Sequence, residues 1–208
     1  MDPAAELQRL CADFDHREIS RTAFLDRCMR ITAAAIGCSR AGTWVFEGWR
    51  EGPQNTVRDA DREGERVGNR DHDTARNALR LHCIALYDAV NDRTTRAPDV
   101  QGPAVSDYYL ALERAGHVVA TDVTAHFATA GLFEQKLQRN VVRSLLATAF
   151  SINGRLYGAF TCTQLGAEVE WSRQQLNALR AVGSRVSLAL ANSARDPADG
   201  HPAPLPPH

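Results

Sequence analysis

The stretch "RSLLATAFSINGRLYGAFTC", residues 143–162, decides the fold, because it predicts two strands joined by a tight turn. Apolar or small residues recur at every second position in both halves; they are Leu145, Ala147 and Ala149, then Leu156, Gly158, Phe160 and Cys162. Between the halves lies Asn153-Gly154, and both residues tolerate the positive φ that a two-residue hairpin turn requires. We therefore expect an antiparallel pair of strands.

A long amphipathic helix is predicted directly after this hairpin. Ser172 and, three positions later, Gln175 form the pattern that caps the first turn of a helix. Apolar residues then recur at three- and four-residue steps and so share one face; they are Leu176, Leu179, Val182, Val186, Ala189 and Leu190. The C-terminal part of the domain is thus expected to be a sheet with a helix packed on it.

The composition fits one globular domain and argues against several classes of protein. With 208 residues, 44% of them hydrophobic, the chain can bury one ordinary core. A net charge of −1 argues against a nucleic-acid partner, because such proteins carry a basic face for phosphates. No apolar run approaches the roughly 20 residues that cross a bilayer, and the start "MDPAAELQRLCADFD" is polar. We expect a cytoplasmic protein without a membrane partner.

Two helices and two strands are predicted in the N-terminal half. One helical stripe lies within residues 1–19 and a second begins at Ser20 and ends at Gly37. Their apolar positions are Leu7, Leu10, Cys11 and Phe14, then Phe24, Leu25, Cys28, Ile31, Ala35 and Ile36. The aromatic and β-branched residues of "SRAGTWVFEGW" and "LRLHCIALYDAV" favour strands.

Two segments are expected to lie outside the packed core. Residues 48–79 carry charges of both signs and almost no large apolar side chains, which predicts a polar, mobile surface loop. Residues 193–208 are rich in proline and are expected to be disordered. The domain itself is expected to span residues 20–192.

The middle of the chain alternates short helices and a strand. A helix is expected from Ser106 to about Ala115, a strand over residues 117–123, and another helix from Thr129 to near Arg139. Taken with the hairpin and the terminal helices, this order predicts an α+β fold built on an antiparallel sheet.

These residues resemble a GAF domain, the small-molecule sensor module of bacterial signalling proteins and of some phosphodiesterases. The resemblance covers residues 20–192 and is carried by Ser144-Leu145-Leu146, Gly154-Arg155-Leu156, Gly158 and Trp171-Ser172, together with "DYYLALERAGHVVATDVTAHFATAGLF". It implies about six antiparallel strands, with N- and C-terminal helices on one face and a lid-covered ligand pocket on the other. It also implies a regulatory role and a homodimer formed through the terminal helices.

Alternation along the second hairpin strand assigns its two faces, because a floor strand shows one face to the helices and one to the cavity. Tyr157, Thr161 and Thr163 are expected to line the pocket, since they carry the hydroxyl groups. Leu156, Phe160 and Cys162 are expected to seat the terminal helices.

The lid supplies further candidate ligand-binding residues, a mixture of aromatic and polar side chains that suits a planar heterocycle; they are Tyr108, Tyr109, Asp122, His126, Phe127 and Phe133. The alternative is that the aromatic rings fill a core, and we favour it for Phe127 and Phe133. Arg143 is a candidate for a ligand phosphate or carboxylate, the alternative being a solvated surface arginine.

No metal site or covalent chromophore is expected. The seven histidines lack metal-ligand spacing, and the "DADREGER" run has Arg70 where a calcium loop needs glutamate. Some GAF domains hold a bilin through a cysteine of the lid, but residues 104–140 contain none. The cofactor and the ligand stay unassigned.

The function that the sequence favours is a non-enzymatic sensor that signals through its terminal helices. Five cysteines with irregular spacing suit reduced thiols. One alternative is a thiol-based redox enzyme or sensor, similar to methionine sulfoxide reductase, that uses Cys83 and Cys162. Another is a dimerising scaffold without a ligand.

Overall fold

The computed structural model of this chain describes residues 2–48, 79–134, 142–152 and 155–194. The predicted polar loop, the Asn153-Gly154 turn, the predicted helix end near Arg139 and the tail after Ala194 lie outside the described residues.

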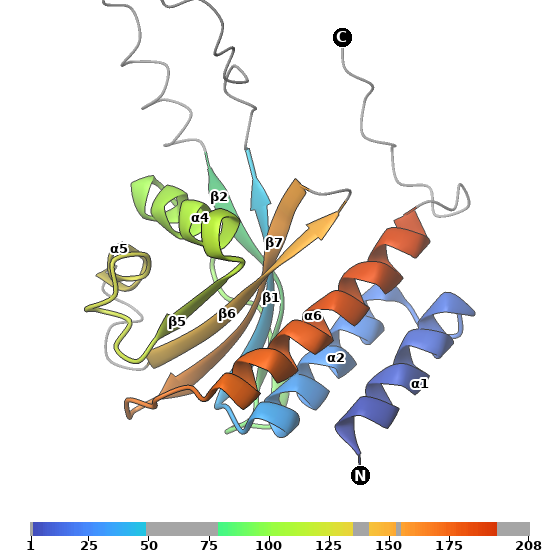
Figure 1. Ribbon diagram of the computed structural model, residues 1–208. Helices are drawn as coiled ribbons and strands as arrows, with labels where there is room; N and C mark the ends of the chain where they lie inside the picture. The colour runs from blue at the N-terminus through green and yellow to red at the C-terminus, as the bar shows by residue number, and fades with distance from the viewer. Residues whose placement is uncertain (1, 49–78, 135–141, 153–154, 195–208) are drawn as a thin grey trace, which may run out of the picture.

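Twelve helices and strands follow one another in the described part of the chain (Figure 1). The helices are α1 (Pro3–Asp15), α2 (Arg21–Ile36), α4 (Pro103–Ala115), α5 (Ala130–Glu134) and α6 (Arg173–Ala194). The strands are β1 (Arg40–Glu47), β2 (Arg80–Asp88), β3 (Arg93–Thr95), β4 (Val100–Gln101), β5 (His117–Ala120), β6 (Val142–Ile152) and β7 (Arg155–Leu165).

The strands form one antiparallel sheet in the order β3-β2-β1-β7-β6-β5, with β4 also paired to β2. This confirms the predicted α+β fold and the predicted hairpin, whose strands run from Val142 to Leu165. Strands β3 and β4 were not predicted, because they are short and show no apolar alternation.

One face of the sheet is covered by α2 and α6, and α1 packs on these two helices (Figure 1). Ser20 caps α2 by accepting the Ala23 N–H at 3.2 Å, and Gly37 ends it with φ at +73°. Ala35, predicted on the apolar stripe, is exposed, and Ala33 is buried instead. The helix-side core, as we call it, centres on the following residues: Phe14, Phe24, Met29, Leu146, Phe150, Phe160, Leu179 and Val186.

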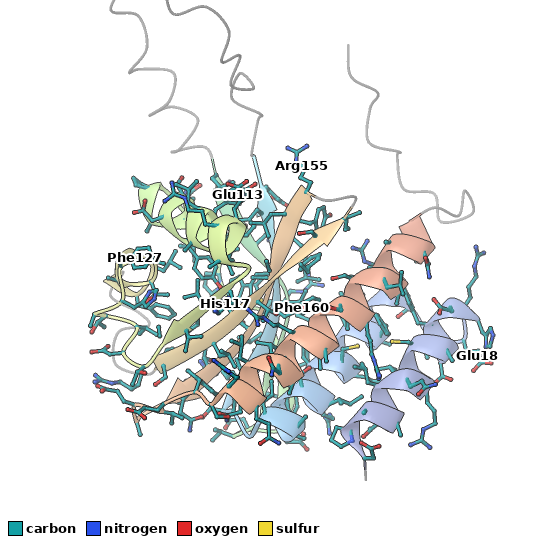
Figure 2. All side chains as sticks on the ribbon, viewed as in Figure 1. Glu18, Glu113, His117, Phe127, Arg155 and Phe160 are labelled. Carbon is teal, nitrogen blue, oxygen red and sulfur yellow. The ribbon has the colours of Figure 1, made fainter. Side chains whose placement is uncertain are left out.

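The close approach of α6 to the sheet depends on a glycine in the middle of that helix. A Cβ atom added at Gly183 would lie 3.2 Å from the Phe160 ring and 3.3 Å from the Thr148 hydroxyl. Figure 2 shows Phe160 between the sheet and α6.

The opposite face is covered by α4 and α5 (Figure 1). Helix α4 begins at Pro103 and not at Ser106 as predicted, because Gly102 precedes it with a φ of 109° and a proline at the first helical position is already in helical geometry. Predicted strand 117–123 ends at Ala120. The lid-side core contains Tyr108, Tyr109, Leu112, Phe133, Leu145 and Ala147, with Trp44 and Phe46 packed against it.

A β-bulge in β7 changes which side chains share a face. Phe150 pairs with Gly158 and Ser151 with Leu156, so Tyr157 is an extra residue in β7. The Tyr157 ring lies 5.4 Å from the ring of Phe150, which belongs to the helix-side core, while Leu156 packs against the lid-side core. The predicted faces of Tyr157 and Leu156 are therefore wrong, because strict alternation does not continue through a bulge.

The remaining predicted faces of β7 are confirmed. Phe160 and Cys162 belong to the helix-side core. Thr161 lies opposite Ala147 and Thr163 opposite Leu145, and both partners belong to the lid-side core.

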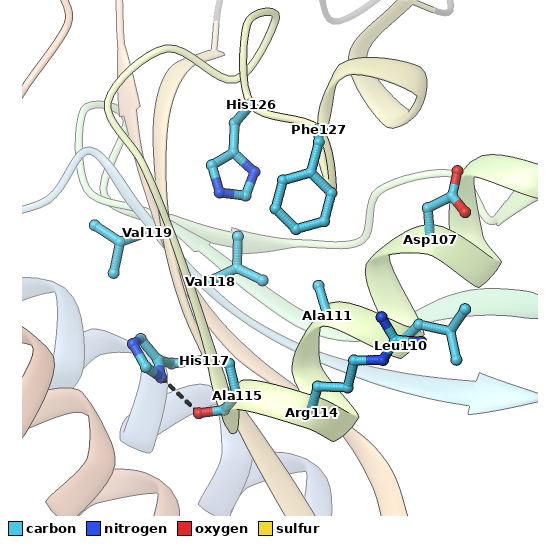
Figure 3. Close-up of a pocket in the computed structure, with 10 residues that line it drawn as sticks. All are labelled: Asp107, Leu110, Ala111, Arg114, Ala115, His117, Val118, Val119, His126 and Phe127. Atoms are coloured by element: carbon cyan, nitrogen blue, oxygen red, sulfur yellow. Dashed lines mark hydrogen bonds between the residues drawn. The ribbon is translucent and has the colours of Figure 1, made fainter.

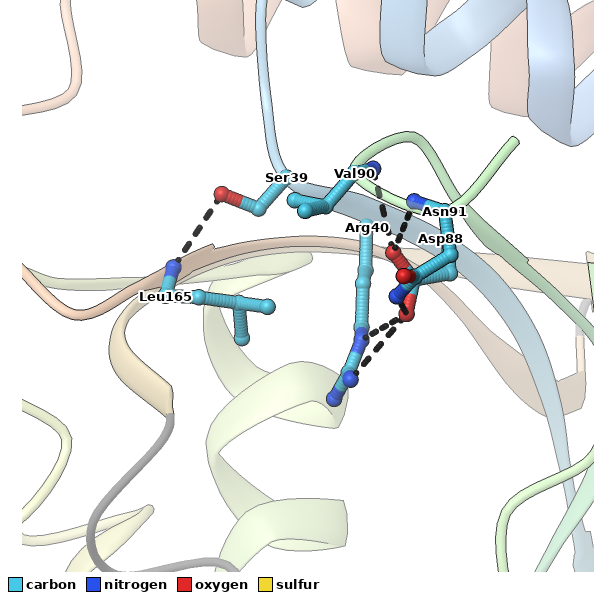
Figure 4. Close-up of polar contacts among 6 residues, drawn as sticks. All are labelled: Ser39, Arg40, Asp88, Val90, Asn91 and Leu165. Atoms are coloured by element: carbon cyan, nitrogen blue, oxygen red, sulfur yellow. Dashed lines mark hydrogen bonds and ion pairs between the residues drawn. The ribbon is translucent and has the colours of Figure 1, made fainter. Parts of the chain in front are cut away.

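A buried carboxylate joins the start of β1 to the end of β2 and the turn that follows it, at the corner shown in Figure 4. Asp88, 1% exposed, accepts from the Arg40 guanidinium at 3.2 and 3.3 Å. It also accepts from the Val90 N–H, the Asn91 N–H and the Asn91 side-chain amide at 3.0 to 3.2 Å. Beside it, Ser39 Oγ accepts the Leu165 N–H at 3.2 Å. We call this group the Asp88 corner.

Candidate functional site

A cleft of about 720 Å³ lies between α4, β5 and the segment that joins β5 to α5 (Figure 3). We call it the α4–β5 cleft. Its volume lies in the range of small-molecule sites, roughly 300 to 1,000 Å³. The residues that line it are Asp107, Leu110, Ala111, Arg114, Ala115, His117, Val118, Val119, His126 and Phe127.

Helix α4 presents different residues to the cleft and to the core. Asp107, Leu110, Ala111 and Arg114 are spaced at three- and four-residue steps, so they share the face toward the cleft. The opposite face carries Tyr108, Tyr109 and Leu112, which are buried in the lid-side core. The cleft wall is therefore apolar in its middle, with one carboxylate and one guanidinium at its ends.

Strand β5 forms the back of the cleft and is the outermost strand of the sheet. Figure 3 shows Val118 and Val119 pointing to opposite sides of the strand. Val118 packs in the lid-side core, and Val119 packs against the helix-side core. The cleft thus follows the edge of the sheet and touches both of its faces.

The third wall comes from the segment between β5 and α5, which is held by short local hydrogen bonds. Asp122 Oδ1 accepts the Thr124 N–H at 2.8 Å and the Thr124 hydroxyl at 2.7 Å. These bonds from Thr124 lower the pKa of Asp122. The buried Thr129 hydroxyl donates to the Val123 carbonyl at 2.8 Å. Together they fix the turn that presents His126 and Phe127.

His126 and Phe127 form a stacked pair over the cleft, with ring centroids 4.8 Å apart. Burial lowers the pKa of His126, so its imidazole is neutral at neutral pH. Its Nδ1 accepts the Ala128 N–H at 3.2 Å, which leaves the proton on Nε2. Phe127 is 77% exposed, so the favoured expectation that its ring fills a core is wrong.

His117 connects the cleft to the helix layer. Its Nδ1 lies 2.7 Å from the Ala115 carbonyl oxygen and 2.9 Å from Arg180 Nη2 of α6. Figure 2 shows His117 beside α6. Nδ1 can donate to Ala115 when it carries a proton, or accept from Arg180 when it does not, but it cannot do both. The position of the proton on this imidazole therefore decides whether Nδ1 bonds to Ala115 of α4 or to Arg180 of α6.

Among the predicted ligand-binding residues, only His126 and Phe127 line the cleft. Tyr108, Tyr109 and Phe133 are buried in the lid-side core, where Phe46 stacks edge-on against Tyr109 at 5.0 Å. In the described part of the chain the Tyr108 hydroxyl has no hydrogen-bond partner, and burial raises its pKa.

The other predicted residues have structural partners away from the cleft. Arg143 pairs with Glu168, and Thr161 Oγ1 accepts from Trp44 Nε1 at 3.1 Å. Thr163 is half-buried on the lid side, and Tyr157 lies on the helix side. The structure does not bring these four together with His126 and Phe127.

Several cleft residues were not predicted from the sequence. Asp107, Leu110 and Arg114 carried a signal, a stripe at helical spacing on the face opposite the two tyrosines. His117 and Val119 carried none, because only the strand order, in which β5 is outermost, places them at the edge of the sheet.

The two cysteines of the redox alternative lie on opposite faces of the sheet. Cys162 belongs to the helix-side core, whereas Cys83 lies opposite Trp44, which packs on the lid side. Burial raises the pKa of both thiols, and a contact with Cys38 raises that of Cys162 further. The structure therefore does not assemble Cys83 and Cys162 into a redox pair.

Within the described residues, no group of three or more His, Cys, Asp or Glu side chains could hold a metal ion. In the same part of the chain, no helix is both long and apolar enough to span a membrane.

Comparisons with known proteins point to one family. The model of the GAF domain family matches residues 20–190. No curated protein matches the sequence.

Solved structures of low sequence identity share the fold. The blue-light absorbing form of the Thermosynechococcus elongatus PixJ GAF domain has a TM-score of 0.59 at 15% identity, over 86% of this chain and 88% of that one. A phycoerythrobilin-bound GAF domain from a cyanobacterial phytochrome has a TM-score of 0.61 at 12% identity, over 93% and 96%. The free methionine-R-sulfoxide reductase of Neisseria meningitidis, bound to its substrate, has a TM-score of 0.54 at 14% identity, over 93% of each chain.

Proposed function

The chain belongs to the GAF domain family, and on that premise we propose that it is a non-enzymatic sensor of a small intracellular molecule. The α4–β5 cleft is the ligand site, and α6 with its partner helices is the output. The observation that carries this proposal is the contact of His117, a cleft residue, with Arg180 of α6.

The signal passes through the proton on the His117 ring. A ligand that accepts a hydrogen bond from Nε2 keeps the proton there, so Nδ1 stays an acceptor for Arg180. A ligand that donates to Nε2 moves the proton to Nδ1, which then donates to the Ala115 carbonyl and releases Arg180. Binding thus favours one of two positions of the Arg180 side chain.

Hydrogen–deuterium exchange tests this route, using whichever ligand native mass spectrometry or a thermal-shift screen of metabolites identifies. Binding should change exchange in α6 as well as around the cleft. Arg180→Ala should bind the ligand with similar affinity but lose the change in α6, and exposed Arg173→Ala on the same helix should keep it. A wild-type protein that binds ligand without any response in α6 would refute the route.

We further propose that the output is read in a homodimer formed through the terminal helices. Leu188 on α6 is 64% exposed, so its side chain is accessible to a second copy of the chain. Light scattering should report a dimer for the wild type and a monomer for Leu188→Glu. If both variants have the same mass, this interface is wrong.

The thiol alternative and the bilin alternative have separate tests. If Cys83 and Cys162 carried a redox activity, the double substitution to serine would abolish it. Under the sensor proposal the same variant keeps its ligand response. A visible absorption band in the purified protein would favour a chromophore held without a cysteine of the lid.

A further inference from the structure

The α4–β5 cleft opens onto main-chain groups of β5. The Ala149 N–H donates to the Gly116 carbonyl at 2.9 Å, and His117 lies opposite Thr148 in the register. In an antiparallel pair, hydrogen-bonded and non-hydrogen-bonded positions alternate. Val118 therefore bonds to β6, whereas His117 and Val119 point their N–H and C=O groups away from it.

Val119 presents this donor and acceptor to the cleft. Its N–H and C=O lie side by side on the free edge, and no described residue forms a hydrogen bond to them. A row of such groups is usually paired or covered in a folded protein. Two groups of this kind at the back of a cleft are a ready binding site for a molecule with the complementary pair.

The other walls of the cleft restrict the shape and charge of that molecule. Phe127 is 77% exposed, and Leu110 and Ala111 form an apolar wall on α4. These residues suit a flat apolar ring, and Phe127 can cover one face of it. Arg114 supplies a positive charge at the end of the same wall.

We propose that the α4–β5 cleft binds a planar heterocycle with a ring N–H beside a ring C=O, as in lactams and imides, and with one anionic substituent. The heterocycle accepts from the Val119 N–H and donates to the Val119 carbonyl, stacks below Phe127, and places its anion on Arg114. This inference rests on the proposed function, since it names the class of ligand for the same cleft.

An extended peptide is the competing occupant, because it too carries adjacent N–H and C=O groups. The cleft favours the smaller molecule. Strand β5 has four residues, of which only His117 and Val119 face outward, and the volume of about 720 Å³ is that of a small-ligand site.

Nuclear magnetic resonance titration of the ¹⁵N-labelled full chain tests the proposal with three probes. Orotate carries both the imide and a carboxylate, uracil carries only the imide, and 1,3-dimethyluracil has lost both ring N–H groups. Orotate should shift the Val119 amide resonance saturably, and uracil should bind about tenfold more weakly without the charge-assisted bond. 1,3-Dimethyluracil should give no saturable shift of Val119.

Two substitutions separate the main-chain contact from the charge. Val119→Pro removes the outward N–H without removing a bond to β6, because a proline is tolerated at such an edge position. It should weaken orotate binding at least tenfold, whereas Val119→Ala should keep it within about threefold. Arg114→Gln should weaken orotate but leave uracil unchanged. If Val119→Pro does not fold, the wild-type titration still decides.

The outcomes distinguish this inference from the proposed function. Binding that survives N-methylation, or that leaves the Val119 amide unmoved, overturns the ligand class but keeps the sensor. The same holds if an acetylated pentapeptide shifts Val119 and none of the heterocycles does. If no imide probe binds, the ligand class is wrong. The sensor proposal is then tested separately, by native mass spectrometry and by hydrogen–deuterium exchange in α6.

Discussion

Two regions of the sheet, the Asp88 corner and the β5 edge, differ in how completely their polar groups are paired. At the Asp88 corner, a buried carboxylate accepts five hydrogen bonds, from Arg40, Val90 and Asn91. At the β5 edge, within the described residues, the main chain of Val119 lacks partners on its outer side, and Phe127 is 77% exposed.

This difference indicates which residues stabilise the fold and which are available for binding. A paired buried charge is costly to disturb, so the Asp88 corner holds the start of β1 and the end of β2 in place. Unpaired groups and exposed rings contribute little to folding, but they are available to a ligand. We therefore expect substitutions at the corner to change the free energy of unfolding, and substitutions at the cleft to change binding.

The largest expected effect is at the corner. Asp88→Ala should lower the free energy of unfolding by about 3 kcal/mol, because it leaves the Arg40 guanidinium and the turn N–H groups without their acceptor. Urea denaturation followed by circular dichroism measures this. Glu170→Gln, at an exposed carboxylate, should cost less than about 0.5 kcal/mol. Equal losses in the two variants would show that Asp88 matters no more for stability than an exposed carboxylate.

A smaller effect is expected on acidification. Burial works to raise the pKa of Asp88, but hydrogen bonds from Asn91 and Arg40 outweigh it, so the pKa is lowered. A lowered carboxyl pKa contributes stability above the ordinary value near 4 and loses it as the pH falls through the lowered pKa. The difference in stability between wild type and Asp88→Asn should therefore narrow from about pH 5 to about pH 3. A constant difference over that range would show that the carboxylate charge is unimportant.

Two neighbouring tyrosines of α4 also differ in whether their hydroxyl groups are paired. Tyr108→Phe should leave stability unchanged or raise it by up to about 1 kcal/mol, because the buried Tyr108 hydroxyl has no partner in the described residues. Tyr109→Phe should lower it by about 0.5 to 1 kcal/mol, because that hydroxyl donates to Glu113 at 3.3 Å. Thermal denaturation of both variants measures the sign. A loss of stability in Tyr108→Phe would show that its hydroxyl is paired.

The smallest effect on stability is expected in the cleft. Phe127→Ala should change the free energy of unfolding by no more than about 0.5 kcal/mol, because the ring is already mostly in water. It should nevertheless weaken binding of any ligand that stacks in the cleft. Denaturation and ligand titration of the same preparation separate the two quantities. A large loss of stability would mean that Phe127 belongs to the core.

Part of the fold follows from local sequence patterns. The alternation on both sides of Asn153-Gly154 predicted β6 and β7, and the three- and four-residue steps after Ser172 predicted α6. Such patterns depend only on which residues a strand or helix presents to one face. The candidate site was predicted less well, because it depends on contacts between distant elements. His126 was identified, but Phe127 was a candidate for which a core position was favoured, and Tyr157 was assigned to the wrong face.

The sequence by itself determined the antiparallel α+β sheet, because hydrophobic periodicity and turn chemistry are local properties. The family, and the helices on one face that it implies, followed from the resemblance of its motifs to GAF domains. Only the tertiary structure decided where the cleft lies. The bulge at Tyr157 interrupts the alternation of β7. The register of β5 against β6 points the main-chain N–H and C=O of Val119 away from β6. Both depend on pairing between strands, which residue spacing within one strand does not encode.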